Sequence, residues 1–341
     1  MTMIFQRLSR AVLTWSAALI FLSAPLAAAP LPGVNIAGAE FGQPGGRIGV
    51  DYRYAEPREL DYFIAKGFKL FRVPFLASRL LEGPPLTPVL RESDAAPLER
   101  LADHLAARGA IIVIDLHAYG RTRFGQPIAD ALTTQLFSTA WRVIATRFKG
   151  RRNVAFGLMN EPAAQTPREW AQAANAAVAA IREVGARNLI LVPGGMWSTA
   201  SDWMTSGNAQ AMLDVVDPAD NFMIEAHQYL DPDSTGKRTE VVAGAGATRL
   251  AAFTQWARAH RKRAYLGEFG FADTPQAQAE ARAMLGYMAR NADVWKGWTA
   301  WSAGRWWGDY PFSLEPRDGR DAPGMKVLEE FIPRRAVRGR H

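Results

Sequence analysis

Cysteine is absent from the 341 residues, so disulfide bonds contribute nothing to this fold. A chain of this length can bury a large core and does not need them. A linker rich in proline, serine or threonine is also missing, and Gly42, Gly45 and Gly46 lack the spacing of a phosphate-binding loop. The missing linker favours one large domain. The missing glycine spacing argues against a nucleotide-binding protein of the phosphate-loop kind.

Long apolar runs are scarce as well. Residues 11–22 form a short apolar stretch that follows Arg7 and Arg10 and precedes the alanines at 27–29. This order is typical of a secretory signal peptide, and the stretch is too short for a membrane span. We therefore predict a signal peptide over residues 1–29, cleaved between residues 26 and 30, with an uncleaved membrane anchor as the alternative. The mature protein should be secreted, into a periplasm or the extracellular medium, and should not bind a membrane.

Acidic residues are in the minority, since 33 Asp and Glu against 40 Lys and Arg give a formal net charge of +7. A basic balance suggests nucleic acid as a partner. The excess, however, lies in residues 1–29 and in the arginine-rich tail 334–341, and the body between them is nearly neutral. We expect the tail to be a solvated chain end, and we expect no nucleic-acid partner.

Apolar runs of strand length alternate with helical patterns along the rest of the chain. The expected strands are residues 33–38, 68–74, 111–117, 153–159, 189–192, 222–229, 264–270 and 297–303. The expected helices are residues 57–66, 97–108, 133–148, 167–183, 248–259, 275–289 and 325–331. Parallel strands that are covered on both faces read as continuous apolar runs. Eight alternations over roughly 300 residues predict an α/β fold, a single closed (β/α)8 or TIM barrel, which we place at residues 30–333.

Two of these apolar runs end on a carboxylate. Residues 156–162 read Phe-Gly-Leu-Met-Asn-Glu-Pro and contain Asn160 and Glu161, and residues 264–270 contain Glu268. Taken alone, Asn160 could cap a turn and Glu161 could be solvated, but the recurrence of the pattern weakens that interpretation. The carboxyl ends of barrel strands carry the chemistry. Two carboxylates there can supply an acid/base and a nucleophile for the cleavage of an acetal.

Five further polar or aromatic residues stand near the ends of expected strands: Arg72, His117, His227, Tyr229 and Trp301. Each has an ordinary structural explanation when taken singly, such as a paired arginine or a hydrogen-bonded core histidine. Together with two carboxylates they indicate an active site at one edge of the barrel. A cation such as Arg72 would keep a neighbouring carboxylate ionised.

The sequence resembles glycoside hydrolase family 5 over about residues 33–332. The resemblance is carried by Phe71-Arg72-Val73-Pro74, Asp115-Leu116-His117, Asn160-Glu161-Pro162, His227-Gln228-Tyr229, Gly267-Glu268-Phe269-Gly270 and the strand of Trp301. Counterparts of all eight active-site residues of that family are present. Residues 33–42, 225–231 and 301–310 resemble its endoglucanase branch, subfamily 5. Two departures, Ala118 where asparagine is usual and Arg305 where proline is common, leave the chemistry intact but leave subsite preferences open.

The resemblance implies a retaining endo-β-1,4-glucanase that cuts internal bonds of a β-1,4-glucan by double displacement. Glu161 would be the general acid/base and Glu268 the nucleophile, with Arg72 and Tyr229 keeping Glu268 ionised and aimed. The substrate-binding residues would be Arg72, His117, Asn160, His227, Tyr229, Trp301, Trp306, Trp307 and Trp197. The last three are candidates for neighbouring subsites or for packing. No metal or cofactor is needed, since the carboxylates supply both acid and nucleophile, and we expect a monomer.

Other functions stay open at this point. The same mechanism could serve another β-glycan, such as mannan, xyloglucan or mixed-linkage glucan. A non-catalytic carbohydrate-binding barrel would be expected to have lost a carboxylate, whereas both are present. A nucleic-acid-binding protein rests on the basic balance alone.

Overall fold

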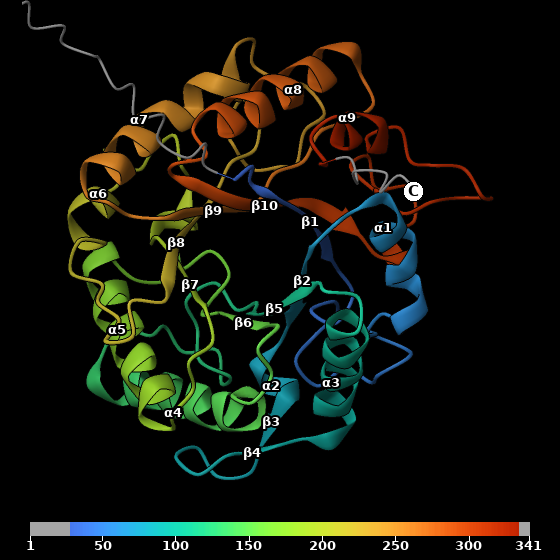
Figure 1. Ribbon diagram of the computed structural model, residues 1–341. Helices are drawn as coiled ribbons and strands as arrows, with labels where there is room; N and C mark the ends of the chain where they lie inside the picture. Colours follow the sequence, from blue (N-terminus) through green and yellow to red (C-terminus); the bar gives the residue numbers. More distant parts are fainter. Residues whose placement is uncertain (1–27, 334–341) are drawn as a thin grey trace, which may run out of the picture.

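The computed structural model describes residues 28–333. The predicted signal peptide, apart from its last two residues, and the predicted tail 334–341 lie outside the described residues. Eight parallel strands close into a barrel in the order β1-β10-β9-β8-β7-β6-β5-β2, seen from one end in Figure 1. The strands are β1 (Leu31–Ile36), β2 (Leu70–Phe75), β5 (Ile111–Leu116), β6 (Val154–Gly157), β7 (Ile190–Pro193), β8 (Phe222–His227), β9 (Ala264–Glu268) and β10 (Trp295–Ala303). The predicted (β/α)8 barrel is confirmed.

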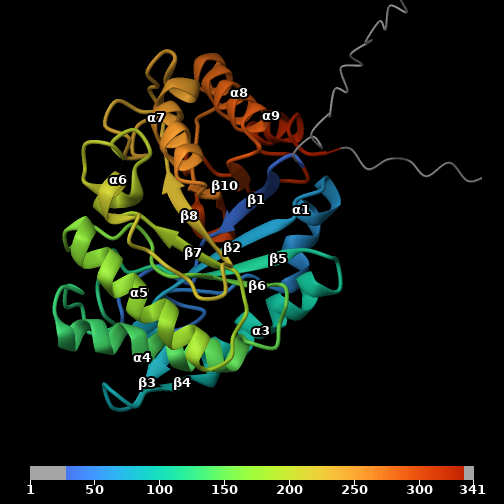
Figure 2. The ribbon, with the colours of Figure 1, turned by 60° about the vertical axis from the view of Figure 1, so that its left-hand side comes forward.

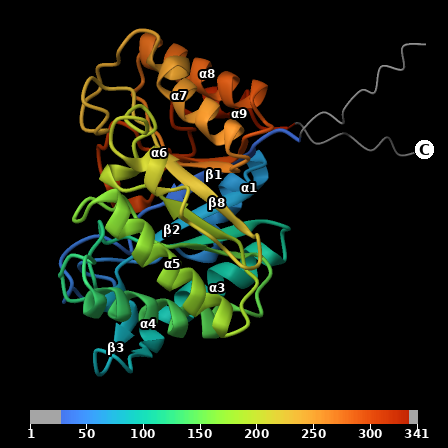
Figure 3. The same ribbon diagram turned by 90° about the vertical axis from the view of Figure 1, so that its left-hand side faces the viewer.

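Helices surround the strands as an outer ring (Figure 1). They are α1 (Asp61–Lys66), α3 (Glu92–Ala106), α4 (Ala131–Phe148), α5 (Pro167–Glu183), α6 (Asn208–Ala211), α7 (Ala245–Ala259), α8 (Pro275–Arg290) and α9 (Met325–Glu329). Figures 2 and 3 show α7 and α8 on one side of the barrel and α3 and α4 on the opposite side. None of the helices within residues 28–333 is long and apolar enough to cross a bilayer.

The apolar core has two parts. The larger part lies between strands and helices and includes Phe71 and Ile114. The smaller part is formed by strand residues one position away from these, Leu70 and Val113, together with Ala155, Leu191 and Tyr265. Successive side chains on a strand point to opposite faces, so this second cluster fills the barrel interior. The strands therefore bury both faces, which explains their continuous apolar runs.

Three helix starts differ from the prediction by more than two residues. The first turn of the helix predicted over residues 57–66 is a 3-10 helix (Pro57–Leu60), and α1 follows it from Asp61. Helix α3 begins at Glu92 rather than Pro97, because its buried stripe extends back to Ala95 and the proline is accommodated inside the helix. Helix α7 begins at Ala245 rather than Thr248, because Glu280 of α8 accepts hydrogen bonds from two backbone N–H groups at its start. A short segment between β2 and α3 was not predicted at all; it forms α2 (Ala77–Leu80) and a hairpin of β3 (Leu81–Glu82) and β4 (Val89–Leu90).

Candidate active site

On the strands that carry candidate residues, the side chains that point into the barrel change from apolar to charged toward the carboxyl end of the strand. Val113, Asp115 and His117 follow one another on this face at β5, and Glu225 and His227 do so at β8, because every second side chain points the same way. Val113 belongs to the apolar layer, whereas Asp115 and Glu225 are completely buried charges. A charged layer thus lies above the apolar one, and histidines lie above the charges.

Arg72 is the completely buried cation of this charged layer. Its Nη2 lies 3.1 Å from Asp115, its Nε lies 3.3 Å from Glu225, and its Nη1 donates to Oε1 of Glu268 at 2.9 Å. Burial would lower the pKa of Arg72, but the three carboxylates raise it well above its ordinary value. Arg72 is therefore a permanent cation that offsets several buried negative charges.

Glu268, at the end of β9, is held by two donors. Arg72 binds Oε1, and the hydroxyl of Tyr229 donates to Oε2 at 2.8 Å. Burial raises the pKa of Glu268, and the nearby charge of Glu161 raises it further, whereas His227 and Arg72 lower it. The two donors fix the orientation of a carboxylate that is only 4% exposed.

Glu161 is the more accessible of the two strand-end carboxylates, with its side chain 17% exposed. The chain just before it is tied to the barrel, since the N–H of Asn160 donates to the carbonyl of Leu116 at 2.7 Å. Glu161 itself has a φ of 43°, a left-handed conformation that is uncommon outside glycine and concentrates at functional sites. Its Oε1 is 2.8 Å from Nδ1 of His227.

Asn160 lies beside the two carboxylates and is oriented by Arg72. The guanidinium Nη2 donates to Oδ1 of Asn160 at 2.7 Å. Because the amide oxygen is used in this way, the amide nitrogen is the atom that remains for a ligand hydroxyl. One arginine thus orients both Glu268 and Asn160.

His117 and Trp301 form one wall of the site. Their rings stack with centroids 5.8 Å apart and an interplanar angle of 18°. Nδ1 of His117 is 3.0 Å from Asp115, and its Nε2 is 3.3 Å from the hydroxyl of Tyr119. The peptide bond between Trp301 and Ser302 is cis.

A cavity of about 800 Å³ opens above these groups and brings most of the predicted site residues together. Eight of them line it: His117, Asn160, Glu161, Trp197, His227, Tyr229, Glu268 and Trp301. An aromatic wall and two carboxylates in one open cavity suit a sugar chain, which offers flat faces and many hydroxyls.

Three residues predicted to bind substrate do not line this cavity. Arg72 is completely buried, so it acts on Glu268 and Asn160 rather than on a ligand. Trp307 adjoins the site from outside the cavity, with its ring stacked on Tyr310 and edge-on to Trp301. Trp306 is 40% exposed but lies outside the cavity.

Several residues at the site had no role in the prediction, and four of them bear on its chemistry. Tyr119 and Tyr310 line the cavity, and Asp115 and Glu225 support the histidines from below. The period of two along a strand could have identified Asp115, Glu225 and Tyr119, since each is two residues from a candidate histidine. Tyr310 lies in an irregular segment after β10 and gives no such signal.

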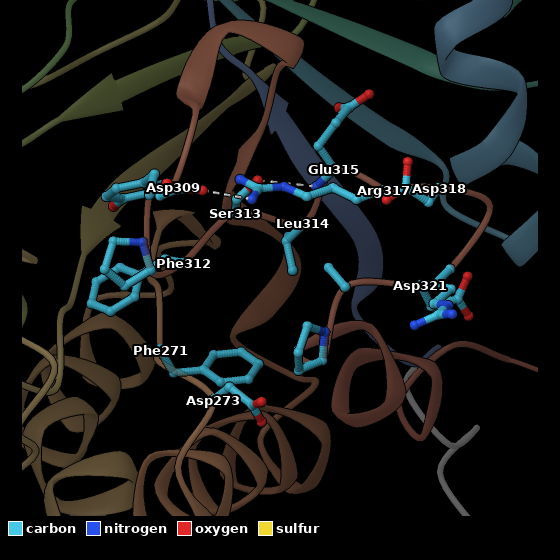
Figure 4. A pocket seen from close by; sticks show the side chains of 16 residues that line it. Phe271, Asp273, Asp309, Phe312, Ser313, Leu314, Glu315, Arg317, Asp318 and Asp321 are labelled. Atoms are coloured by element: carbon cyan, nitrogen blue, oxygen red, sulfur yellow. Dashed lines mark hydrogen bonds and ion pairs between the residues drawn. The ribbon is translucent and has the colours of Figure 1, made fainter.

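A second hollow of about 410 Å³ adjoins the site near Tyr310 (Figure 4). Phe271 and Phe312 form part of its wall, and Arg317 and Asp309 pair at 2.9 Å on its rim. Neither Glu161 nor Glu268 lines this hollow, so the reactive groups belong to the larger cavity.

The potential ligand atoms of Glu161, His227 and Glu268 lie within 4.8 Å of one another, which is close enough for a metal ion. Each of these groups is already paired, however: His227 with Glu161, and Glu268 with Arg72 and Tyr229. A metal would also need a neutral imidazole. We therefore assign no metal site to these residues.

Two carboxylates at the carboxyl ends of the fourth and seventh barrel strands, with oxygens within 4.8 Å of each other, define a glycoside hydrolase. This separation fits the retaining class, whose carboxyl groups lie about 5 Å apart, better than the wider spacing of inverting enzymes.

Comparison with known proteins gives the family. The family model described as Cellulase (glycosyl hydrolase family 5) matches residues 34–304, so the chain belongs to glycosyl hydrolase family 5. Endo-beta-1,4-glucanase B of Aspergillus niger is 36% identical over 303 residues, which make up 88% of this chain and 89% of that protein.

Solved structures agree with this assignment. The crystal structure of an endo-beta-1,4-glucanase from Xanthomonas axonopodis pv. citri is 39% identical, with a TM-score of 0.85 over 89% of this chain and 98% of that chain. The Pseudomonas stutzeri endoglucanase Cel5A, solved in complex with cellobiose, is 32% identical, with a TM-score of 0.82 over 90% of this chain and 93% of that chain.

Proposed function

We propose that this protein is a retaining endo-β-1,4-glucanase that hydrolyses internal bonds of soluble or amorphous β-1,4-glucan. The observation that carries the proposal is the pair Glu161 and Glu268, which face one cavity at a separation suited to double displacement. The names of the relatives and the cellobiose complex support glucan as the substrate.

In the first step, an oxygen of Glu268 attacks the anomeric carbon while the bond to the leaving oxygen breaks. Glu161 gives its proton to that oxygen, so the leaving sugar departs neutral. Glu268 suits the nucleophile because Arg72 and Tyr229 aim it. Glu161 suits the acid because it is the more exposed carboxylate and can reach a leaving group.

In the second step, water attacks the anomeric carbon of the glycosyl-enzyme and releases Glu268 as a carboxylate. Glu161 takes a proton from this water and returns to its starting state. Two inversions give a product with the configuration of the substrate.

The remaining cavity residues would bind the sugar chain. The amide nitrogen of Asn160 would donate to the 2-hydroxyl, an interaction that strengthens in the transition state. Trp301 would stack against the reacting sugar from the wall that it forms with His117, and Trp197, which is 51% exposed, would stack a neighbouring sugar. His117 and His227 would bind hydroxyls or act on the carboxylates, and Trp306 and Trp307 are weaker candidates because they lie outside the cavity.

A panel of polysaccharides tests the proposal. Carboxymethyl cellulose should lose viscosity faster than reducing ends accumulate, because internal cuts shorten chains most. Lichenan, mannan and xyloglucan are assayed beside it. Strong activity on mannan alone would assign the same mechanism to another β-glycan, and no activity on any polymer would favour a non-catalytic binding barrel.

We further propose that the protein is exported with cleavage of residues 1–29 and acts as a monomer without nucleic acid. The basic and apolar pattern of that segment supports export. Mass spectrometry of the mature N-terminus tests the cleavage, and light scattering of the purified protein tests the monomeric state. A gel shift that survives deletion of residues 334–341 would contradict the expectation on nucleic acid.

A further inference from the structure

His227 lies between two carboxylates that come from different strands. Its Nδ1 is 2.8 Å from Oε1 of Glu161, and its Nε2 is 3.1 Å from Oε1 of Glu225. The histidine is 2% exposed and Glu225 is completely buried, so water has little access to the pair. The two steps described above use Glu161 and give no function to Glu225.

The chemistry of imidazole limits where protons can sit in this trio. A neutral imidazole carries one N–H, so an ionised carboxylate at each nitrogen would leave one lone pair facing negative charge. Either both nitrogens of His227 are protonated, or one carboxyl carries a proton and donates it. The guanidinium Nε of Arg72, 3.3 Å from the same oxygen of Glu225, favours negative charge on Glu225. The shared proton therefore lies on the side of Glu161, and Nε2 carries the N–H.

Glu268 is the other charged group that faces the imidazole of His227, and its negative charge also favours the protonated ring. Oε2 of Glu268 lies 3.8 Å from Nδ1. Burial alone would lower the pKa of His227, but Glu268, Glu161 and Glu225 together raise it to about 10. A second proton is thus retained between Nδ1 and Glu161 through the neutral range.

We propose that Glu225 is a positioning residue that holds the Nε2 proton of His227, so that Nδ1 is always the atom that shares a proton with Glu161. The inference rests on the proposed role of Glu161 as acid/base. When the glycosidic bond breaks, the shared proton passes through Glu161 to the leaving oxygen, and His227 keeps its Nε2–H. When water attacks, Glu161 receives the proton back. A buried acid behind a histidine fixes the tautomer in the same way in catalytic triads.

Strand β5 offers a matched comparison. Asp115 is also completely buried, precedes a histidine by two residues and lies 3.1 Å from Arg72. Nε2 of His117, however, faces the hydroxyl of Tyr119 rather than Glu161. Asp115→Asn therefore removes one negative charge from the same layer without acting on the acid/base.

The test compares two substrates that differ in their need for a proton. Cellopentaose has a sugar leaving group that must be protonated, whereas dinitrophenol leaves 2,4-dinitrophenyl β-cellobioside without help. Glu225→Gln should lower kcat/KM on cellopentaose about 100-fold and on the dinitrophenyl substrate less than about threefold. Asp115→Asn should lower both values by the same factor. Glu225→Asp keeps the carboxylate and should keep the wild-type ratio.

Equal losses on both substrates in Glu225→Gln, or the same split in Asp115→Asn, would overturn the proposal. The activity of the wild-type enzyme tests the proposed function separately. A wild type that is inactive on cellopentaose and on every polymer would refute the glycosidase activity, whereas an active wild type with these variant results would refute only the role of Glu225.

Nitrogen NMR of the wild-type protein tests the inference even if Glu225→Gln does not fold. The chain has five histidines, and a His227→Gln spectrum identifies the signal of His227. The expected result is a protonated Nε2 on His227 throughout the active pH range. An unprotonated Nε2 would overturn the assignment.

Discussion

Gly267 lies directly against the carboxyl group of Glu225. A Cβ placed on Gly267 would overlap Oε1 of Glu225 and would lie 2.8 Å from Nε2 of His227. The carbonyl oxygen of Gly267 also accepts hydrogen bonds from the side chains of Asn35 and Thr299. The residue before the nucleophile is therefore a glycine because the buried acid and its histidine occupy the space that a side chain would need.

Gly267→Ala should destabilise the fold by about 1–3 kcal/mol, the usual result of overpacking a buried site. Urea unfolding measures this change. Gly45→Ala is the control, because a Cβ there has no neighbour within 4 Å, and it should change the free energy of unfolding by less than about 0.5 kcal/mol. Equal effects of the two substitutions would show that the space beside Glu225 is not limiting.

Arg72→Met should move the acid limb of the rate profile to higher pH. Arg72 lowers the pKa of Glu268, so its loss raises that pKa and the nucleophile becomes ionised only at higher pH. The profile of kcat/KM against pH measures the shift. Arg72→Lys, which keeps the charge, should move the limb less, and an unmoved acid limb in Arg72→Met would contradict the pairing with Glu268.

Trp301→Ala should reduce activity on carboxymethyl cellulose about 100-fold, because the sugar loses its stacking face and its position. Trp306→Ala is the matched control, since Trp306 is exposed and lies outside the cavity, and it should stay within about twofold of wild type. A loss below twofold for a folded Trp301→Ala would mean that Trp301 serves packing alone.

Chelation should leave the enzyme active. The three groups close enough to hold a metal are already paired with protein partners, and two carboxylates supply the chemistry. Dialysis against EDTA, followed by the carboxymethyl cellulose assay, checks this expectation. A loss of activity that returns when a divalent metal is added would establish a metal requirement.

The barrel could be predicted because each strand is buried on both faces and reads as an apolar run. The site could be predicted from the same apolar runs, since Glu161, His117 and His227 interrupt or end them. Asp115 and Glu225 interrupt them too, but their function depends on which residues they meet across the barrel. Those partners, above all Arg72, come from distant strands.

The features that could not be predicted depend on contacts between distant segments. The start of α7 is capped by Glu280 from the next helix, which no local pattern indicates. Trp306 and Trp307 are adjacent in sequence, yet one is exposed and the other packs on Tyr310. Both lie in a 3-10 helix of three residues (Arg305–Trp307) after β10, which is too short for a helical or strand period to predict which ring is exposed.

Glu268→Ala and Glu161→Ala should differ in the product that azide gives. Without the nucleophile, Glu268→Ala should be nearly inactive on every substrate, and azide should attack from the vacated side to give the α-glycosyl azide. Glu161→Ala should still form the glycosyl-enzyme from an activated aryl cellobioside, which needs no proton to leave. Azide should then intercept that intermediate and give the β-glycosyl azide, and NMR of the isolated azides distinguishes the two products.

The two variants should also differ from each other on natural and activated substrates. Glu161→Ala should stay inactive on polysaccharide, because the sugar leaving group still needs the proton that this residue supplies. Glu268→Ala should show no such preference, because both substrates require a nucleophile at the same carbon. The same azide anomer from both variants, or rescue of neither, would show that the roles assigned to Glu161 and Glu268 are wrong.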